Sequence, residues 1–286
     1  MLTVVVLSQC EKDPESTDYF SDINFVHALI ELGIDTNGDG RISPDEAEVV
    51  TDLNVGVRHI SNMKGIEMLI FLESLYCGGN YVKSLDLSNN TRLRSISCGS
   101  NKISDLDVSN CAALEGLSCS ENRLWRLDVS NCTALQGLNC ARNYLKTLNV
   151  SNCTALIKLT CFENFELTTL NVSNCTALEE LSCYYNSLTT LDVSDCTALE
   201  YLKCGSSWQL STLDVSNCTA LRELECGGCK LTSLDISNNT SLRKLQLKDM
   251  PSLYKVCVWE IPFPPVGVKV DTTGSPNVYF TTDCSK

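Results

Sequence analysis

The sequence has little of what catalysis and nucleic-acid binding require. It holds two histidines, His27 and His59, and neither lies in a known catalytic motif. It contains no G-x-S-x-G, no phosphate-binding P-loop and no H-E-x-x-H. Lys and Arg number 22 against 35 Asp and Glu, a net charge of −13. The acidic balance argues against nucleic acid as a partner, and the missing motifs indicate that the chain is not an enzyme.

Cysteine, by contrast, is abundant and regularly spaced. The chain has 18 cysteines, and most of them recur every 21 or 22 residues. A first column holds Cys77, Cys98, Cys119, Cys140, Cys161, Cys183, Cys204 and Cys226. A second column holds Cys111, Cys132, Cys153, Cys175, Cys196 and Cys218, with Asn90 and Asn239 at its two ends. Such a short, constant period indicates a solenoid of stacked repeats.

The repeat from Leu114 to Ala134 shows the pattern in full. It reads Leu114-x-x-Leu117-x-Cys119-x-x-Asn122-x-Leu124 and ends on L-D-V-S-N-C-T-A. This resembles the leucine-rich-repeat pattern L-x-x-L-x-L-x-x-N-x-L, with Cys in place of the third Leu. The short period is similar to internalin-type repeats, and the L-D-V-S-N-C-T-A-L phrase resembles surface proteins of gut Bacteroidetes. The resemblance implies a leucine-rich-repeat solenoid over residues 53–253, a right-handed β-α/3-10 superhelix with a parallel concave sheet.

Chain geometry explains the repeat. In a strand around residues 117–119, alternation turns Leu117 and Cys119 inward and Ser118 outward. An inward amide at the end of the strand can bond the backbone of the turn, which suits Asn122 and its equivalents. These equivalents are Asn80, Asn101, Asn143, Asn164 and Asn186. Asp128 and Ser130 begin turns on the opposite side, and we interpret them as capping residues in preference to a metal ladder.

The cysteine columns predict packing in preference to cross-linking. Neighbouring strands lie about 4.8 Å apart, whereas a disulfide places its Cβ atoms about 3.8 Å apart. We therefore expect buried, reduced thiols. Cys226 and Cys229 match C-x-x-C, but Cys226 belongs to the first column and Cys229 stands at the Asn position, so a redox role is the weaker interpretation. Cys257 and Cys284 lie outside the columns, and whether they pair stays open.

Residues 18–52 predict a helical cap for the first repeat. Apolar residues recur at helical spacing between Phe20 and Ile30. Residues 35–46 then match the EF-hand loop D-x-[DN]-x-[DN]-G-x5-E, which predicts one structural Ca²⁺. The expected ligands are Asp35, Asn37, Asp39, the Arg41 carbonyl, Ser43 and Glu46. The alternatives are a calcium-free turn and a dockerin-like module, although dockerins carry two such loops and this sequence has one.

Both ends of the chain depart from the repeat. Residues 254–286 predict a β-hairpin cap, because alternating valines flank the turn at Gly274-Ser275-Pro276. Residues 1–17 resemble a signal remnant or lipoprotein-like linker, in which Cys10 precedes an acidic stretch as in surface lipoproteins of Bacteroidetes. We therefore expect an exported, monomeric protein at the outer cell surface, lipid-anchored at Cys10. The alternative is an apolar tail with an incidental cysteine.

The outward positions of the predicted strands indicate where a partner binds. They are small in the early repeats, at Ser95, Ser97, Gly116, Ser118 and Gly137, and larger later. Exposed aromatic side chains can stack on sugar rings or anchor a peptide, so we expect a protein or glycan partner there. The predicted partner-binding residues are Phe162, Phe165, Tyr184, Tyr185, Tyr201, Lys203 and Trp208. The alternative is a structural or adhesive stalk without a specific small ligand.

Overall fold

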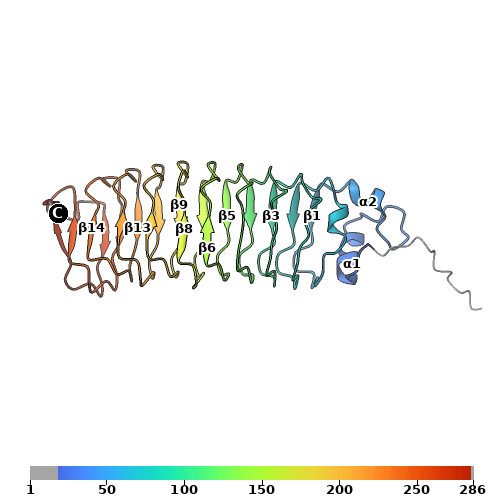
Figure 1. Cartoon of the computed structure of the whole chain (residues 1–286), viewed down its shortest axis with the longest axis horizontal. Coiled ribbons are helices and arrows are strands. Elements are labelled where there is room, and N and C mark those ends of the chain that lie inside the picture. The colour runs from blue at the N-terminus through green and yellow to red at the C-terminus, as the bar shows by residue number, and fades with distance from the viewer. Residues whose placement is uncertain (1–18, 285–286) are drawn as a thin grey trace, which may run out of the picture.

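The computed structural model describes residues 19–284, whose coils stack along one axis into an elongated solenoid (Figure 1). Each coil contributes one three-residue strand to an eleven-stranded parallel sheet, the main sheet. Its strands in spatial order are β1 (Asp52–Asn54), β2 (Ser74–Tyr76), β3 (Ser95–Ser97), β4 (Gly116–Ser118), β5 (Gly137–Asn139), β7 (Lys158–Thr160), β9 (Glu180–Ser182), β11 (Tyr201–Lys203), β13 (Glu223–Glu225), β15 (Lys244–Gln246) and β17 (Lys269–Asp271). Neighbours pair in register, so Leu117 lies beside Ile96 and Leu138. The predicted solenoid with a parallel sheet is confirmed.

The opposite side of the coils differs from the predicted β-α/3-10 architecture. It carries turns and short parallel strands, and within residues 19–284 a 3-10 helix occurs once, η1 (Ile66–Met68). The strands are β6 (Thr147–Asn149) with β8 (Thr169–Asn171), β10 (Leu191–Asp192) with β12 (Leu213–Asp214), and β14 (Ser233–Asp235), β16 (Lys255–Cys257) and β18 (Tyr279–Thr281) together. In β6 only the central Leu148 is buried. One buried side chain between two exposed ones is the alternation of a strand, and it favours an extended segment over a helix there.

Leucine and cysteine fill the interior without a break. Leu117 is 2% exposed and Cys119 is fully buried. Fifteen cysteines of the described chain are free and buried, which confirms the predicted thiol packing. In the second column the Cys132 Sγ lies 3.8 Å from the Val108 carbonyl oxygen of the preceding coil. Burial raises the pKa of Cys98 and Cys140 to about 12, so these thiols stay protonated and unreactive at neutral pH.

The C-x-x-C cysteines belong to the same interior. Cys226 and Cys229 are both free thiols, as the ladder interpretation predicts. Cys229 replaces the ladder asparagine, and its Sγ lies 3.5 Å from the Cys204 carbonyl oxygen. The C-x-x-C motif therefore arises because the first-column cysteine and the ladder-asparagine position are three residues apart in every repeat, and in this repeat both are cysteine.

A small helical cap covers the first coil. Helices α1 (Ile23–Glu31) and α2 (Pro44–Glu48) precede β1, and Phe25 and Leu29 of α1 are fully buried. Asp22 caps α1 through Oδ1, which accepts the backbone N–H groups of Asn24 and Phe25. Its Oδ2 accepts the N–H of Ser61 at 2.8 Å, so one carboxylate joins the cap to the first coil. No helix among residues 19–284 is long and apolar enough to cross a membrane.

The predicted C-terminal hairpin is wrong, because residues 254–284 continue the coil. Strand β17 pairs in parallel with β15, and β18 pairs in parallel with β16. Ten residues separate Lys269 from Tyr279, the same interval as from Gly137 to Thr147 in an earlier coil. The alternating valines correctly predicted two strands. They did not predict the strand partners, because the segment between β17 and β18 crosses to the opposite side of the coil instead of reversing in a tight turn. A disulfide between Cys257 and Cys284 joins β16 to the segment after β18.

Candidate binding surface

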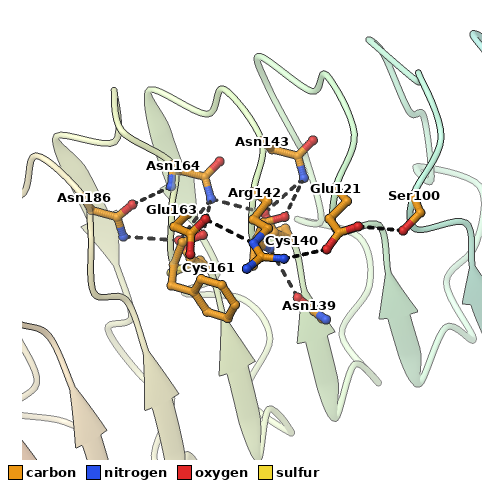
Figure 2. Close-up of polar contacts among 12 residues, drawn as sticks. Ser100, Glu121, Asn139, Cys140, Arg142, Asn143, Cys161, Glu163, Asn164 and Asn186 are labelled. Atoms are coloured by element: carbon orange, nitrogen blue, oxygen red, sulfur yellow. Dashed lines mark hydrogen bonds and ion pairs between the residues drawn. The ribbon is translucent and has the colours of Figure 1, made fainter.

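A column of left-handed residues lies where the chain leaves the main sheet. It includes Ser100, Glu121, Arg142, Glu163, Tyr185 and Ser206, with φ between 53° and 56°. Non-glycine residues adopt positive φ uncommonly, so the turn must be held by other contacts. The asparagine ladder supplies them: Asn143 Nδ2 donates to the carbonyl oxygens of Cys119 and Cys140, both at 3.1 Å. The predicted role of the ladder asparagines is confirmed (Figure 2).

Charged side chains from this column form a ladder along the surface. Ser100 Oγ donates to the Glu121 carboxylate at 2.8 Å, and Arg142 contacts Glu121 at 2.7 Å and Glu163 at 3.1 Å (Figure 2). The hydrogen bonds from Ser100 and Arg142 lower the pKa of Glu121. Exposed ion pairs contribute only about 0–1 kcal/mol each to stability. This row of polar contacts therefore fixes the positions of the surface side chains and contributes little to the stability of the fold.

An aromatic cluster lies in the next coils, where the chain leaves the main sheet. It consists of Phe162, Tyr184 and Tyr185. The rings of Phe162 and Tyr184 stack with centroids 4.6 Å apart, and the Tyr185 ring meets Tyr184 edge-on at 5.5 Å. The Arg142 guanidinium lies 5.7 Å from the Phe162 ring centre. Burial in this stack raises the pKa of Tyr184. Phe162 and Tyr184 therefore support one another, while Tyr185 remains 47% exposed.

Next to the aromatic cluster lies a hollow of about 320 Å³. We call it the Tyr185 hollow. Four of the seven predicted partner-binding residues line it: Tyr184, Tyr185, Lys203 and Trp208. Phe162 is not a lining residue, but its ring stacks on Tyr184, which is. Phe165, 66% exposed, and Tyr201, half-buried on β11, are not among the lining residues.

The outward side chains of the later strands are paired by charge. Lys203 Nζ lies 3.8 Å from the Glu225 carboxylate, and Lys244 contacts both Glu225 and Glu223. Lys158 and Glu180 pair on β7 and β9. Strands β3 to β5 instead present the small residues that the sequence predicted, Ser95, Ser97, Gly116, Ser118 and Gly137. The Tyr185 hollow therefore lies on a face whose charges largely compensate one another.

Eight of the twelve residues that line the hollow were not among the predicted partner-binding residues. Its floor is formed by Gly205, Ser206, Gly227 and Gly228, and its far end by Lys248 and Asp249. Two of these glycines lie inside the stretch read as C-x-x-C. The signal was nevertheless available: aligning the positions after each first-column cysteine places Gly and Ser directly beside the tyrosine pair.

The predicted calcium loop joins α1 to α2. Gly38 and Gly40 have φ of 75° and 79°, a conformation that glycine adopts readily. The Asp35 carboxylate accepts the N–H groups of Gly38 at 2.7 Å and Gly40 at 2.9 Å. Backbone and side-chain hydrogen bonds from Ser43, with others from Thr36, lower the pKa of Glu46 to about 2. The N–H and O–H groups of Thr36 and Ser43 thus hold the two ends of the loop together around the ionised Glu46 carboxylate.

The opposite-side aspartates act as the capping interpretation predicts. Asp128 Oδ1 accepts the backbone N–H of Ser130 at 2.9 Å, and Asp107 accepts that of Ser109 at the same distance. The bonds from Ser130 lower the pKa of Asp128. The two histidines lie elsewhere: His27 is on α1, and the His59 ring stacks on Tyr81. Nothing in the described chain gathers them with the hollow into a catalytic arrangement.

Comparison with known proteins identifies the architecture. No protein-family model and no curated protein matches the sequence. Among solved structures, the functional domain of InlJ from Listeria monocytogenes, described as including a cysteine ladder, is similar with 31% identity and a TM-score of 0.72. The alignment covers 91% of this chain and 61% of that domain, so the chain spans about three fifths of its length.

Two more distant structures share the fold alone. Internalin C2 from Listeria monocytogenes aligns over 92% of this chain and 95% of its own at 15% identity and a TM-score of 0.50. The LRIM1/APL1C complex aligns over 80% of this chain and 51% of that one at 19% identity and a TM-score of 0.59. The chain is therefore a leucine-rich-repeat solenoid with internalin-like structural neighbours.

Proposed function

We propose that the chain is an exported binding module that holds a protein or glycan partner on its main sheet, around the aromatic cluster and the Tyr185 hollow. The carrying observation is the exposure of Tyr185 (47%) and Trp208 (66%) beside a hollow, on a face whose charges are largely paired. Exposed Trp and Tyr side chains are the residues that most often dominate binding energy. A fold of stacked repeats supplies the rigid surface that such anchors need.

Binding by defined variants tests this function. The wild-type chain is applied to a glycan array and to a panel of extracellular-matrix proteins, and saturable signals are titrated. The double variant Tyr185→Ala/Trp208→Ala should lose these signals, because it removes the two exposed rings beside the hollow. The double variant Trp125→Ala/Tyr144→Ala is the matched control, since these rings are 55% and 56% exposed and lie outside the hollow.

The outcomes separate the candidate functions. Loss of binding in the first variant, with the melting temperature preserved and the control unaffected, supports the module. Binding that survives in the Tyr185/Trp208 variant places the partner on another face. No saturable binding to either panel favours the structural or adhesive stalk.

We also propose that one Ca²⁺ binds the loop between α1 and α2. Carboxylate and amide oxygens from Asp35, Asn37 and Asp39 suit this ion, as do the Arg41 carbonyl, Ser43 and Glu46. Within the described chain, Asp35, Asp39 and Glu46 do not bring their oxygens within 4.8 Å of one another. Binding therefore requires Glu46 to exchange its N–H and O–H donors for the ion. Calcium would then tighten the cap on the first coil.

Export to the outer cell surface is part of the same proposal. The Cys257–Cys284 disulfide supports it, because disulfides persist mainly in oxidising compartments. The fifteen free thiols are compatible with such a compartment, since burial shields them. The lipidation site predicted at Cys10 lies outside the described residues. Labelling cells with a radiolabelled fatty acid, with Cys10→Ala as the control, tests the anchor.

A further inference from the structure

The Tyr185 hollow exists because two neighbouring columns of side chains are interrupted together. The first position after the inward residue that ends each coil's strand segment (Cys183, Cys204, Cys226 and then Leu247) reads Tyr184, Gly205, Gly227 and Lys248 in four successive coils. The next position, with positive φ throughout, reads Tyr185, Ser206, Gly228 and Asp249. Large residues thus stand three coils apart, roughly 14 Å at the usual strand spacing. At these two positions the intervening coils carry only glycine and one serine, Ser206.

Close approach of the coils keeps the floor bare. A Cβ atom on Gly205 would lie 2.8 Å from the Gly227 carbonyl oxygen, and one on Gly227 would lie 2.8 Å from the Lys248 carbonyl oxygen. Backbone atoms cannot yield to such contacts as a flexible side chain does. The floor is therefore part of the folded coil and is formed before any ligand arrives, which lowers the cost of binding.

Flat apolar rings and hydrogen-bonding groups line different parts of the hollow. Tyr185 and Trp208 have rings exposed to solvent, whereas Tyr184 is occupied by its stack on Phe162. Gln246, Lys248 and Asp249 add an amide, an ammonium group and a carboxylate. Ring faces accept C–H surfaces, while these polar groups donate to and accept from hydroxyl groups.

Charge pairing argues against an acidic ligand. The two lysines of the hollow already have acidic partners, since Lys203 lies 3.8 Å from Glu225 and Lys248 lies 3.0 Å from Asp271. Lys244 also contacts Glu225. A phosphate or sugar acid would have to break one of these pairs and would meet Asp249 as well. A neutral ligand rich in hydroxyl groups uses the same donors and acceptors without that penalty.

We propose that the Tyr185 hollow is a subsite for one neutral pyranose ring of a glycan, with its C–H face on Trp208 and Tyr185 and its hydroxyl groups toward Gln246, Lys248 and Asp249. The proposal rests on the proposed binding function and specifies its ligand class. The volume, about 320 Å³, lies at the lower end of ordinary small-ligand sites. An apolar peptide anchor is the competing occupant, but it would offer Gln246 and Asp249 no hydrogen-bonding group.

Four neutral probes and one acidic probe test the subsite. The probes are the methyl glycosides of glucose, galactose, mannose and N-acetylglucosamine, with methyl glucuronide as the acidic comparison. Saturation-transfer NMR detects contact with the full chain, and titration gives Kd. We expect at least one neutral glycoside to bind saturably and more tightly than the glucuronide.

Two variants of the hollow and one control complete the experiment. Trp208→Ala removes one ring, and Ser206→Tyr fills the floor at a backbone position where the neighbouring coil already carries Tyr185 with the same φ. Each should weaken the bound glycoside about tenfold or more. Trp125→Ala, an exposed ring outside the hollow, should leave Kd unchanged. Unchanged melting temperatures show that the variants fold.

Several results would overturn the subsite. These are no binding of any neutral glycoside, preference for the glucuronide, or a Kd that Ser206→Tyr leaves unchanged. If the glycosides fail while a matrix protein binds and Tyr185→Ala/Trp208→Ala abolishes that binding, the proposed module stands and its ligand is a protein. If nothing binds at all, both proposals fall.

Discussion

The side-chain amide of Asn143 donates a hydrogen bond to the carbonyl oxygen of Cys119, one coil earlier, at 3.1 Å. Its Oδ1 accepts the backbone N–H of Leu124 at 2.9 Å, so both halves of the amide act between coils. Asn143 is only 3% exposed, and water cannot replace these contacts. The cohesion of successive coils thus depends on buried amides as well as on apolar packing.

Removing one ladder amide should therefore destabilise the solenoid strongly. Asn143→Ala leaves the buried N–H of Leu124 without its partner, which costs about 1–3 kcal/mol. The carbonyl oxygens of Cys119 and Cys140 each lose one of two amide donors and keep the other, from Asn122 and Asn164. We expect a loss of about 2–4 kcal/mol in the free energy of unfolding by urea denaturation. Asn131→Ala is the control, because Asn131 makes an exposed hydrogen bond to the Ser109 carbonyl oxygen, and its loss should be under about 1 kcal/mol. Equal effects would show that the ladder is not special.

The ladder was predictable because it follows from one repeated local pattern. The spacing of Leu117, Cys119 and Asn122 fixes which side chains turn inward, and stacking copies of it gives the sheet and both cysteine columns. The partners of β17 and β18 were not predictable in this way, because strand pairing depends on the path of the whole coil. The Tyr185 hollow was predicted only in part, since its aromatic rings stand out in the sequence while its floor consists of glycines, Gly205 and Gly227, that contribute no side chain.

The dry cysteine column predicts a sharp difference between two small substitutions. Cys140→Ala loses the contacts of one sulfur atom and should cost about 1–2 kcal/mol. Cys140→Ser adds a hydroxyl group to a fully buried site and should cost more, about 2–4 kcal/mol. Urea denaturation measures both, and Ser118→Ala on the outward side of the neighbouring strand should be nearly neutral. A serine variant as stable as the alanine variant would mean that water reaches the column.

The same burial predicts the reactivity of the thiols. Because the pKa of Cys98 and Cys140 is raised to about 12, almost none of either thiol is ionised at pH 8. A colourless disulfide reagent that releases a coloured thiolate should react slowly with the fifteen buried thiols of residues 19–284 in the folded chain, and quickly with them in denaturant. Fast reaction of several thiols in the folded chain would contradict the buried ladder.

Glu46 predicts a dependence of stability on pH. The folded chain holds its pKa at about 2, below the ordinary value of 4.5, because the carboxylate accepts hydrogen bonds from Ser43 and Thr36. The unfolded chain therefore binds more protons between these values, and the contribution of Glu46 is full above about pH 4.5 and falls as the pH drops toward 2. Glu46→Gln should lower the melting temperature at pH 7 and reduce its decline between pH 5 and 2. Glu48→Gln, which removes the same charge from an exposed position on α2, should leave both unchanged.

Calcium should stabilise the cap through the oxygens of the same loop. An isolated loop of this kind binds with a Kd on the order of 10⁻⁴ to 10⁻³ M. About 10 mM calcium would then add about 1.4–2.7 kcal/mol to the free energy of unfolding, seen as a rise in melting temperature. Asp39→Ala should abolish the rise, whereas Asp45→Ala, which removes an equal charge outside the proposed ligand set, should keep it. Because Glu46 must release Ser43 and Thr36 to reach the ion, Glu46→Gln should lose the calcium effect as well as the acid-side slope. A melting curve that calcium leaves unchanged would mean that the hydrogen-bonded loop is already the final state of the cap.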